Sequence, residues 1–360
     1  MDRLARVFAV DRKGFSVPGA VGAAGVLLVT LIAIDQLNQQ KYFLSVVMAV
    51  LFVALSDPGG GYPDRALRMT VFALFGAALT ALGFYVGGHA WGYMVLALFV
   101  VTLLSGLAVR FGRHTFAAGL LLNVWFIITL VLPASYSQAH IPTKGWQQAL
   151  AWLVGAGAWL AFTCIVWLAS RRAWRPRAVM EIPGDTGGPV ELTRPVVFYA
   201  LIRALAVAGS GAIAFGLHEP NASWLPLATL IAMKPDLAQS KLVAVQRLLG
   251  AALGAVVAVP VLLAVDNDDA LKAIVIVLAA LAASLHGVNY LYYCAAVACG
   301  VLIAMDVPNP TNYASEGRRV LFTFIGVAIG VVVMFLADLL QKHNATPTTP
   351  PGQTPGSAAS

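Results

Sequence analysis

Charged residues are scarce in this sequence, and their scarcity excludes most soluble folds. Aspartate, glutamate, lysine and arginine together make up 11% of the 360 residues, whereas hydrophobic residues make up 59%. A typical soluble domain is about one-quarter charged. The composition is therefore that of a membrane protein whose chain crosses the bilayer several times.

Cysteine and clustered acidic residues are also rare. The three cysteines, Cys164, Cys294 and Cys299, all lie in apolar stretches, so neither a disulfide framework nor a Cys-x-x-Cys zinc site is expected. Membrane-embedded prenyl- and phosphatidyl-transferases hold magnesium with paired aspartates on helices. The aspartate cluster at 266–269 lies instead in a short loop that we expect outside the cell. No enzyme activity, metal or cofactor is predicted, and a transferase is the least favoured function.

Long apolar stretches dominate what is present. A helix needs ~20 apolar residues to cross the hydrocarbon core. The sequence predicts an all-α membrane protein with about twelve transmembrane helices. The segments are about 17–34, 42–55, 69–87, 92–109, 116–133 and 147–169, then 196–217, 224–233, 236–265, 270–285, 289–305 and 319–340.

The order of these segments repeats at a spacing of ~175 residues. This spacing predicts two six-helix repeats, at 1–169 and 196–342, joined by a cytoplasmic linker at 170–195 that is rich in arginine, glycine and proline. Because each half has an even number of crossings, the repeats would be parallel, related by an axis along the membrane normal. Residues 343–360 are predicted to form a disordered tail.

Basic residues are unevenly divided between the two sides of the proposed spans. Seventeen of the 23 lysines and arginines lie on the side of the termini, five lie on the other side, and Arg203 lies within a span. The positive-inside rule then places both termini in the cytoplasm. The same rule explains the net charge of +7, so nucleic acid is not an expected partner.

The stretch 224–254 is the most informative part of the chain. Trp224 begins an apolar segment of about a dozen residues that ends at Lys234, which is short for a full crossing. Asp236 and Gln239 resemble a helix N-cap and its return partner, so a second helix is expected to begin there. Further along that helix, glycines at 250 and 254 are one turn apart and predict a strip for close helix packing.

This pattern resembles the FUSC family, the fusaric-acid-resistance and aromatic-acid-exporter type of membrane protein. The family repeat reads roughly Trp-x-x-(Leu)-Thr, then Pro, then Arg-x-x-Gly-Thr-x-x-Gly. The matching residues are Trp224, Thr229, Pro235, Arg247, Gly250 and Gly254, with Ala251 in place of the threonine, and Arg203 resembles the arginine that often opens the repeat. The resemblance covers about residues 196–265.

The resemblance implies a transporter of the bacterial inner membrane that exports small aromatic or related organic carboxylates. An organic-anion channel is the alternative, because the same basic residues would line a pore. The expected partners are membrane lipid and a small organic anion. A periplasmic adaptor protein and a second copy of the chain both remain open as further partners.

Five residues are candidates for substrate binding: Arg203, Trp224, Thr229, Lys234 and Arg247. Thr229 is included because it falls on the family motif. The others also have structural interpretations. Arg203 could extend to the membrane surface along its apolar stem, Lys234 could complement a helix dipole, and Trp224 and Arg247 could anchor helices at the interface.

Two histidines are candidates for proton coupling. His114 and His286 are expected in loops before the fifth crossing of each half, and histidine is the side chain whose charge changes most easily near neutral pH. Residues 56–68, which include Asp57, Arg65 and Arg68, are expected to form a cytoplasmic loop. Arg203 would then be the one basic residue inside a span.

Overall fold

The computed structural model describes residues 8, 17–138, 140–173, 191–217, 223–233, 241–285, 288–306 and 313–344. These residues form helices and short connections, with no β-strand among them. In the first half the α-helices are α2 (Val17–Gln36), α3 (Phe43–Leu55), α4 (Tyr62–Val86), α5 (Trp91–Leu107), α6 (Arg113–Gln138) and α7 (Gly145–Ala169), with short 3₁₀ turns η2 (Gln40–Tyr42) and η3 (Ala108–Phe111).

In the second half the helices are α8 (Arg194–Leu217), α9 (Trp224–Ala232), α10 (Lys241–Ala264), α11 (Asp268–Leu285), α12 (Tyr290–Asp306) and α13 (Tyr313–Asn344). The twelve α-helices of the described residues follow the order of the twelve apolar segments. Most of the linker, residues 174–190, lies outside the described part of the chain, as do the N-cap expected at Asp236 and Gln239 and the tail from 345.

Five helices of the described chain are long and apolar enough to cross a membrane. They are α4, α5 together with η3, α6, α7 and α8. The lipid-facing sides of such helices must be apolar. Exposed large side chains along two of these helices fit that requirement: Leu74, Phe75 and Leu82 on α4, and Leu96, Val100 and Leu104 on α5. The all-helical membrane architecture is therefore confirmed, whereas twelve crossings remain a prediction.

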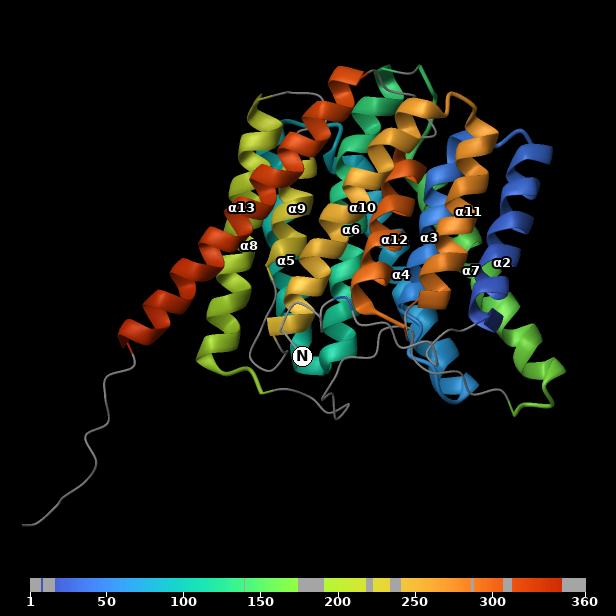
Figure 1. Cartoon of the computed structure of the whole chain (residues 1–360), viewed down its shortest axis with the longest axis horizontal. Coiled ribbons are helices and arrows are strands. Elements are labelled where there is room, and N and C mark those ends of the chain that lie inside the picture. Colours follow the sequence, from blue (N-terminus) through green and yellow to red (C-terminus); the bar gives the residue numbers. More distant parts are fainter. Residues whose placement is uncertain are drawn as a thin grey trace, which may run out of the picture.

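The helices run side by side and form a bundle, with α2, α7 and α11 toward one end and α8 and α13 toward the other (Figure 1). Helix α5 packs against α8, and α11 packs against α2. Helix α4 packs against α6 and α7, and α10 packs against α12. Contacts between the first six helices and the last six are therefore made at both α5–α8 and α2–α11.

Two short helices occupy the interior of the bundle. Eleven of the 13 residues of α3 are buried, as are seven of the nine residues of α9. A longer helix packs directly on each of them through a glycine. A Cβ at Gly155 of α7 would lie 2.2 Å from the carbonyl oxygen of Val46 in α3, and a Cβ at Gly326 of α13 would lie 2.4 Å from that of Leu225 in α9.

Helix α4 begins seven residues earlier than the sequence predicts. Gly59 and Gly60, which have positive φ, interrupt the chain after α3. Pro63 then lies in the first turn of α4, where its missing N–H would have no helical partner in any case. The expectation that Arg65 and Arg68 lie in a loop is therefore wrong, because both are helical residues of α4.

Candidate functional site

Three charged side chains are buried within the described residues: Asp57, Arg65 and Arg203. An arginine placed centrally in a membrane helix costs ~2.5–3.5 kcal/mol on insertion scales. Buried charges in such helices therefore mark the places where a functional site is to be sought. Asp57 and Arg65 form one site, and Arg203 forms another.

Arg203 lies in the interior of α8. It follows the first residue of the helix, Arg194, by nine positions, which corresponds to ~13 Å of helix. Its side chain has no exposed surface, and its Cζ lies 5.2 Å from the ring centroid of Phe116 in α6. A side chain that extended to the membrane surface would not be enclosed in this way. This conformation therefore favours an internal cation over a surface anchor.

The level of Arg203 along α5 follows from two close contacts between α5 and α8. A Cβ at Gly106 would lie 2.9 Å from the Cβ of Ala200, and a Cβ at Gly211 would lie 2.6 Å from Cδ2 of Leu98. Residue numbers rise along one helix as they fall along the other, so the two helices are antiparallel. Arg203 therefore lies between these two contacts, closer to that of Gly106.

Polar side chains from α5 and α6 lie at the same level of α5. Asn123 of α6 donates hydrogen bonds from Nδ2 to Thr102 Oγ1 (3.0 Å) and Ser105 Oγ (3.1 Å) of α5. All three residues are buried. Hydrogen bonds of this kind join helices within a membrane. They also make this part of the bundle more polar than the apolar clusters around it.

Trp224 and Thr229 both lie in α9. Trp224 is buried in an apolar cluster that also contains Val207 and Phe215 of α8. The Thr229 hydroxyl lies 2.9 Å from the carbonyl oxygen of Leu225 and 3.1 Å from that of Gly326. It therefore takes part in the contact between α9 and α13.

The remaining candidates are only partly described. Lys234 and His286 lie outside the described residues, and Arg247 lies in α10 without a described side chain. His114 lies in the first turn of α6 rather than in a loop, so that part of the prediction is wrong. The helix begins before His114 because Gly112, with a φ of 106°, ends the preceding 3₁₀ turn.

The two packing candidates, Gly250 and Gly254, lie where α10 meets α12. A Cβ at Gly250 would lie 2.5 Å from the carbonyl oxygen of Leu291, and one at Gly254 would lie 2.5 Å from that of Ala295. At both positions the obstructing atom belongs to the backbone, which cannot easily move aside. The two helices can therefore approach this closely only because these positions carry no side chain.

The sequence did not predict the ion pair between Asp57 and Arg65. Arg65 is 2% exposed and donates from Nε to Asp57 Oδ1 at 2.6 Å, and one of its terminal nitrogens donates to Oδ2. The backbone N–H of Gly59 donates to the same Oδ1 at 3.0 Å. Arg203 is therefore not the one basic residue inside a membrane-length helix. The sequence feature that could have indicated this ion pair is an acidic and a basic residue on either side of a glycine-rich turn.

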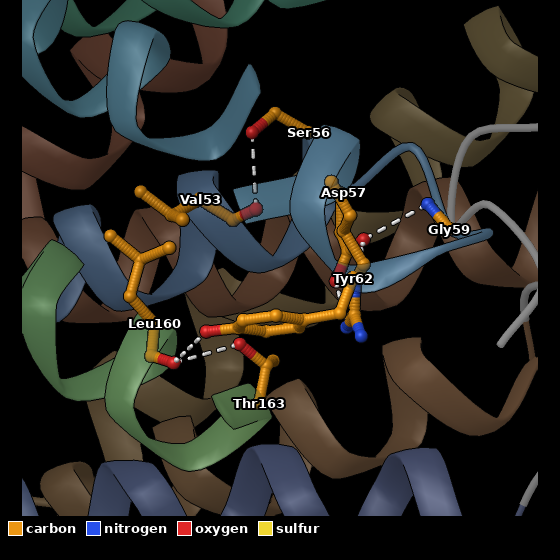
Figure 2. Close-up of polar contacts among 8 residues, drawn as sticks. Val53, Ser56, Asp57, Gly59, Tyr62, Leu160 and Thr163 are labelled. Carbon is orange, nitrogen blue, oxygen red and sulfur yellow. Dashed lines mark hydrogen bonds and ion pairs between the residues drawn. The ribbon is translucent and has the colours of Figure 1, made fainter. Parts of the chain in front are cut away.

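Tyr62, in the same turn of α4, connects this ion pair to α7. Its hydroxyl donates to the carbonyl oxygen of Leu160 at 3.3 Å, and its ring stacks on Trp167 with centroids 4.8 Å apart. Figure 2 shows Asp57, Gly59 and Tyr62 at the junction of α3 and α4, with Tyr62 directed toward Leu160 and Thr163. The junction is therefore attached to α7 as well as closed by an ion pair.

The fold and these buried charges define a polytopic helical membrane protein with polar groups inside its bundle. Residues 205–333 match the family model described as fusaric acid resistance protein-like, which confirms the resemblance seen in the stretch 224–254. The match begins two residues after Arg203 and continues into α13. No curated protein and no solved structure matches the chain. The second half of the chain is thus similar to the FUSC family, which is consistent with a transporter in general.

Proposed function

We propose that this protein exports small organic carboxylates, aromatic ones in particular, across the bacterial inner membrane. The observation that carries the proposal is the fully buried guanidinium of Arg203 beside the ring of Phe116. A guanidinium binds a carboxylate through two parallel hydrogen bonds, and this geometry selects planar anions. An aromatic ring beside it offers a surface on which a substrate ring can pack. The family description, which refers to fusaric acid, an aromatic carboxylic acid, supports the same class of substrate.

The proposed site lies between two six-helix repeats. Helix pairs at corresponding positions of the two halves pack in the same way. The packing of α5 on α8 corresponds to that of α11 on α2, and the packing of α3 on α7 corresponds to that of α9 on α13. The tetrapeptide Gly-Ala-Ala-Leu occurs in both α4 and α10, at 76–79 and 250–253. Arg203 and Phe116 would then come from different repeats. A site between repeats is the usual position in transporters of this general design.

Outward movement of an anion does not need proton coupling. The inside-negative potential favours it by ~2.3 kcal/mol per charge per 100 mV. His114 and His286 are therefore optional in this scheme. A voltage-driven process is equally compatible with an organic-anion channel, which remains the second candidate function.

The test is efflux from proteoliposomes that contain benzoate and carry an imposed potential. Efflux should increase with voltage in the wild type and be lost in Arg203→Gln, while circular dichroism and gel filtration show folded protein. Lys342→Gln is the control and should retain efflux, because Lys342 follows the last predicted apolar segment. Unimpaired efflux in Arg203→Gln would remove the basis of the proposal. Unitary currents in planar bilayers would favour the channel.

A further inference from the structure

We propose that Arg65 is a second carboxylate-binding site, which is occupied in this conformation by the chain's own Asp57. The ligand that would replace Asp57 is a free monocarboxylate. That this ligand is also the transported acid rests on the proposed function. Binding to Arg65 can be measured without transport.

The donors that surround the carboxylate of Asp57 form a built anion site. Two belong to the guanidinium of Arg65, and the third is the N–H of Gly59, 3.0 Å from Oδ1. Both charged side chains are at most 3% exposed. An organic acid bound to Arg65 would place its carboxylate where the carboxylate of Asp57 now lies, paired with the guanidinium and shielded from water.

The two charged partners are held differently. Arg65 lies within α4, one helical turn after Tyr62, whereas Asp57 lies beyond the end of α3 in the connection between the helices. Gly59 and Gly60 have φ values of 66° and 81°. A Cβ at Gly60 would meet nothing within 4 Å, so this glycine serves the backbone conformation and not close packing. The carboxylate is thus carried on a turn outside the helices, and the guanidinium on a helix.

An aromatic side chain shares this turn with Arg65. Tyr62 and Arg65 are three residues apart, which places them on one face of α4. The ring of Tyr62 stacks on Trp167 of α7. This combination of a buried guanidinium with a nearby aromatic group resembles that of Arg203 with Phe116. A carboxylate with an apolar body would find both kinds of contact at either arginine.

The competing explanation is that the ion pair only fixes the junction of α3 and α4. Chemical rescue distinguishes the two. Asp57→Ala removes the carboxylate group and leaves space beside the guanidinium of Arg65. Added acetate or benzoate should then raise the unfolding midpoint of the purified protein in detergent by about 2 °C or more at concentrations well above Kd. Benzamide, which is neutral, should not.

Double variants assign the effect to its site. Rescue should persist in Asp57→Ala/Arg203→Gln and be lost in Asp57→Ala/Arg65→Gln. Loss of rescue in the Arg203 double variant alone, or equal rescue by benzamide, would overturn the proposal. If Asp57→Ala is recovered folded only when carboxylate is present throughout purification, and the Arg65 double variant is not recovered, the proposal is supported. If carboxylate never restores a folded Asp57→Ala, it is overturned.

A second variant measures binding directly. Asp57→Ser keeps a small polar group at the junction and should bind one more benzoate per protein than the wild type in equilibrium dialysis. Arg65→Gln in that background should remove the additional site. An unchanged number of sites in Asp57→Ser would overturn the proposal. Failure of the proposed function would instead appear as wild-type binding that does not depend on Arg203.

Discussion

The guanidinium of Arg203 and the ring of Phe116 meet within the bundle, with Cζ 5.2 Å from the ring centroid. One residue belongs to α8 and the other to α6, and 87 positions separate them in the sequence. A cation that faces an aromatic ring gains about 0.5–2 kcal/mol, with the larger values at desolvated sites. The ring therefore both stabilises and orients the arginine that we propose as the carboxylate-binding group.

Replacing Phe116 should weaken the binding of aromatic acids. In Phe116→Leu the cation–π interaction is lost, and benzoate affinity should fall about 2- to 30-fold, the factor that corresponds to this energy range. Isothermal titration calorimetry on the purified protein measures it. Phe116→Tyr should bind benzoate as the wild type does, as should Phe111→Leu, which alters a ring that is 73% exposed. Unchanged affinity in Phe116→Leu would separate the ring from the site.

Loss of a basic residue near α9 and α10 should affect the acid more than its amide. Lys234→Gln and Arg247→Gln should each weaken benzoate binding while leaving benzamide binding nearly unchanged, because a cation attracts only the charged ligand. Competition binding with the two ligands provides the comparison. Equal losses for acid and amide would indicate a structural role for these residues, such as the helix-dipole and interfacial roles considered above.

Two glycines in α7 should respond in opposite ways to alanine. Gly155→Ala places a Cβ 2.2 Å from the carbonyl oxygen of Val46 and should lower the free energy of unfolding by about 1–3 kcal/mol. Gly157 is exposed, and a Cβ there meets nothing within 4 Å. Gly157→Ala should raise stability by about 0.5–1 kcal/mol, because alanine is the better helix former. Denaturant unfolding in detergent measures the free energy of unfolding of both variants. Equal changes in the two variants would show that α7 does not contact α3 this closely.

Reporter fusions should locate the ends and loops of the chain. A fusion at Lys342 should be active in the cytoplasm, since seventeen of the 23 basic residues lie on the side assigned to the termini. A fusion at Lys144, in the connection before α7, should be active in the periplasm. Periplasmic activity at Lys342 would mean that the number of crossings is odd and that the repeats are not parallel.

The helical architecture follows from local features of the sequence. Apolar length and the residues that interrupt it are local properties, so the twelve segments, the shortness of α9 and the depth of Arg203 in α8 could all be predicted. The residue at which α4 begins was predicted less accurately. Proline and charge in residues 56–68 favoured a loop, but proline is compatible with a first helical turn, and Arg65 is neutralised by a residue eight positions away.

The contacts between residues of different helices could not be predicted in this way. The ion pair of Asp57 with Arg65 and the contact of Arg203 with Phe116 depend on how helices are placed in the bundle. Trp224 and Arg203 both belong to the sequence motif, yet Trp224 packs in an apolar cluster whereas Arg203 meets Phe116 of α6. Helix formation follows from interactions along the chain, whereas a site is made by side chains that packing brings together from separate helices, and hydrophobicity alone does not specify that pairing.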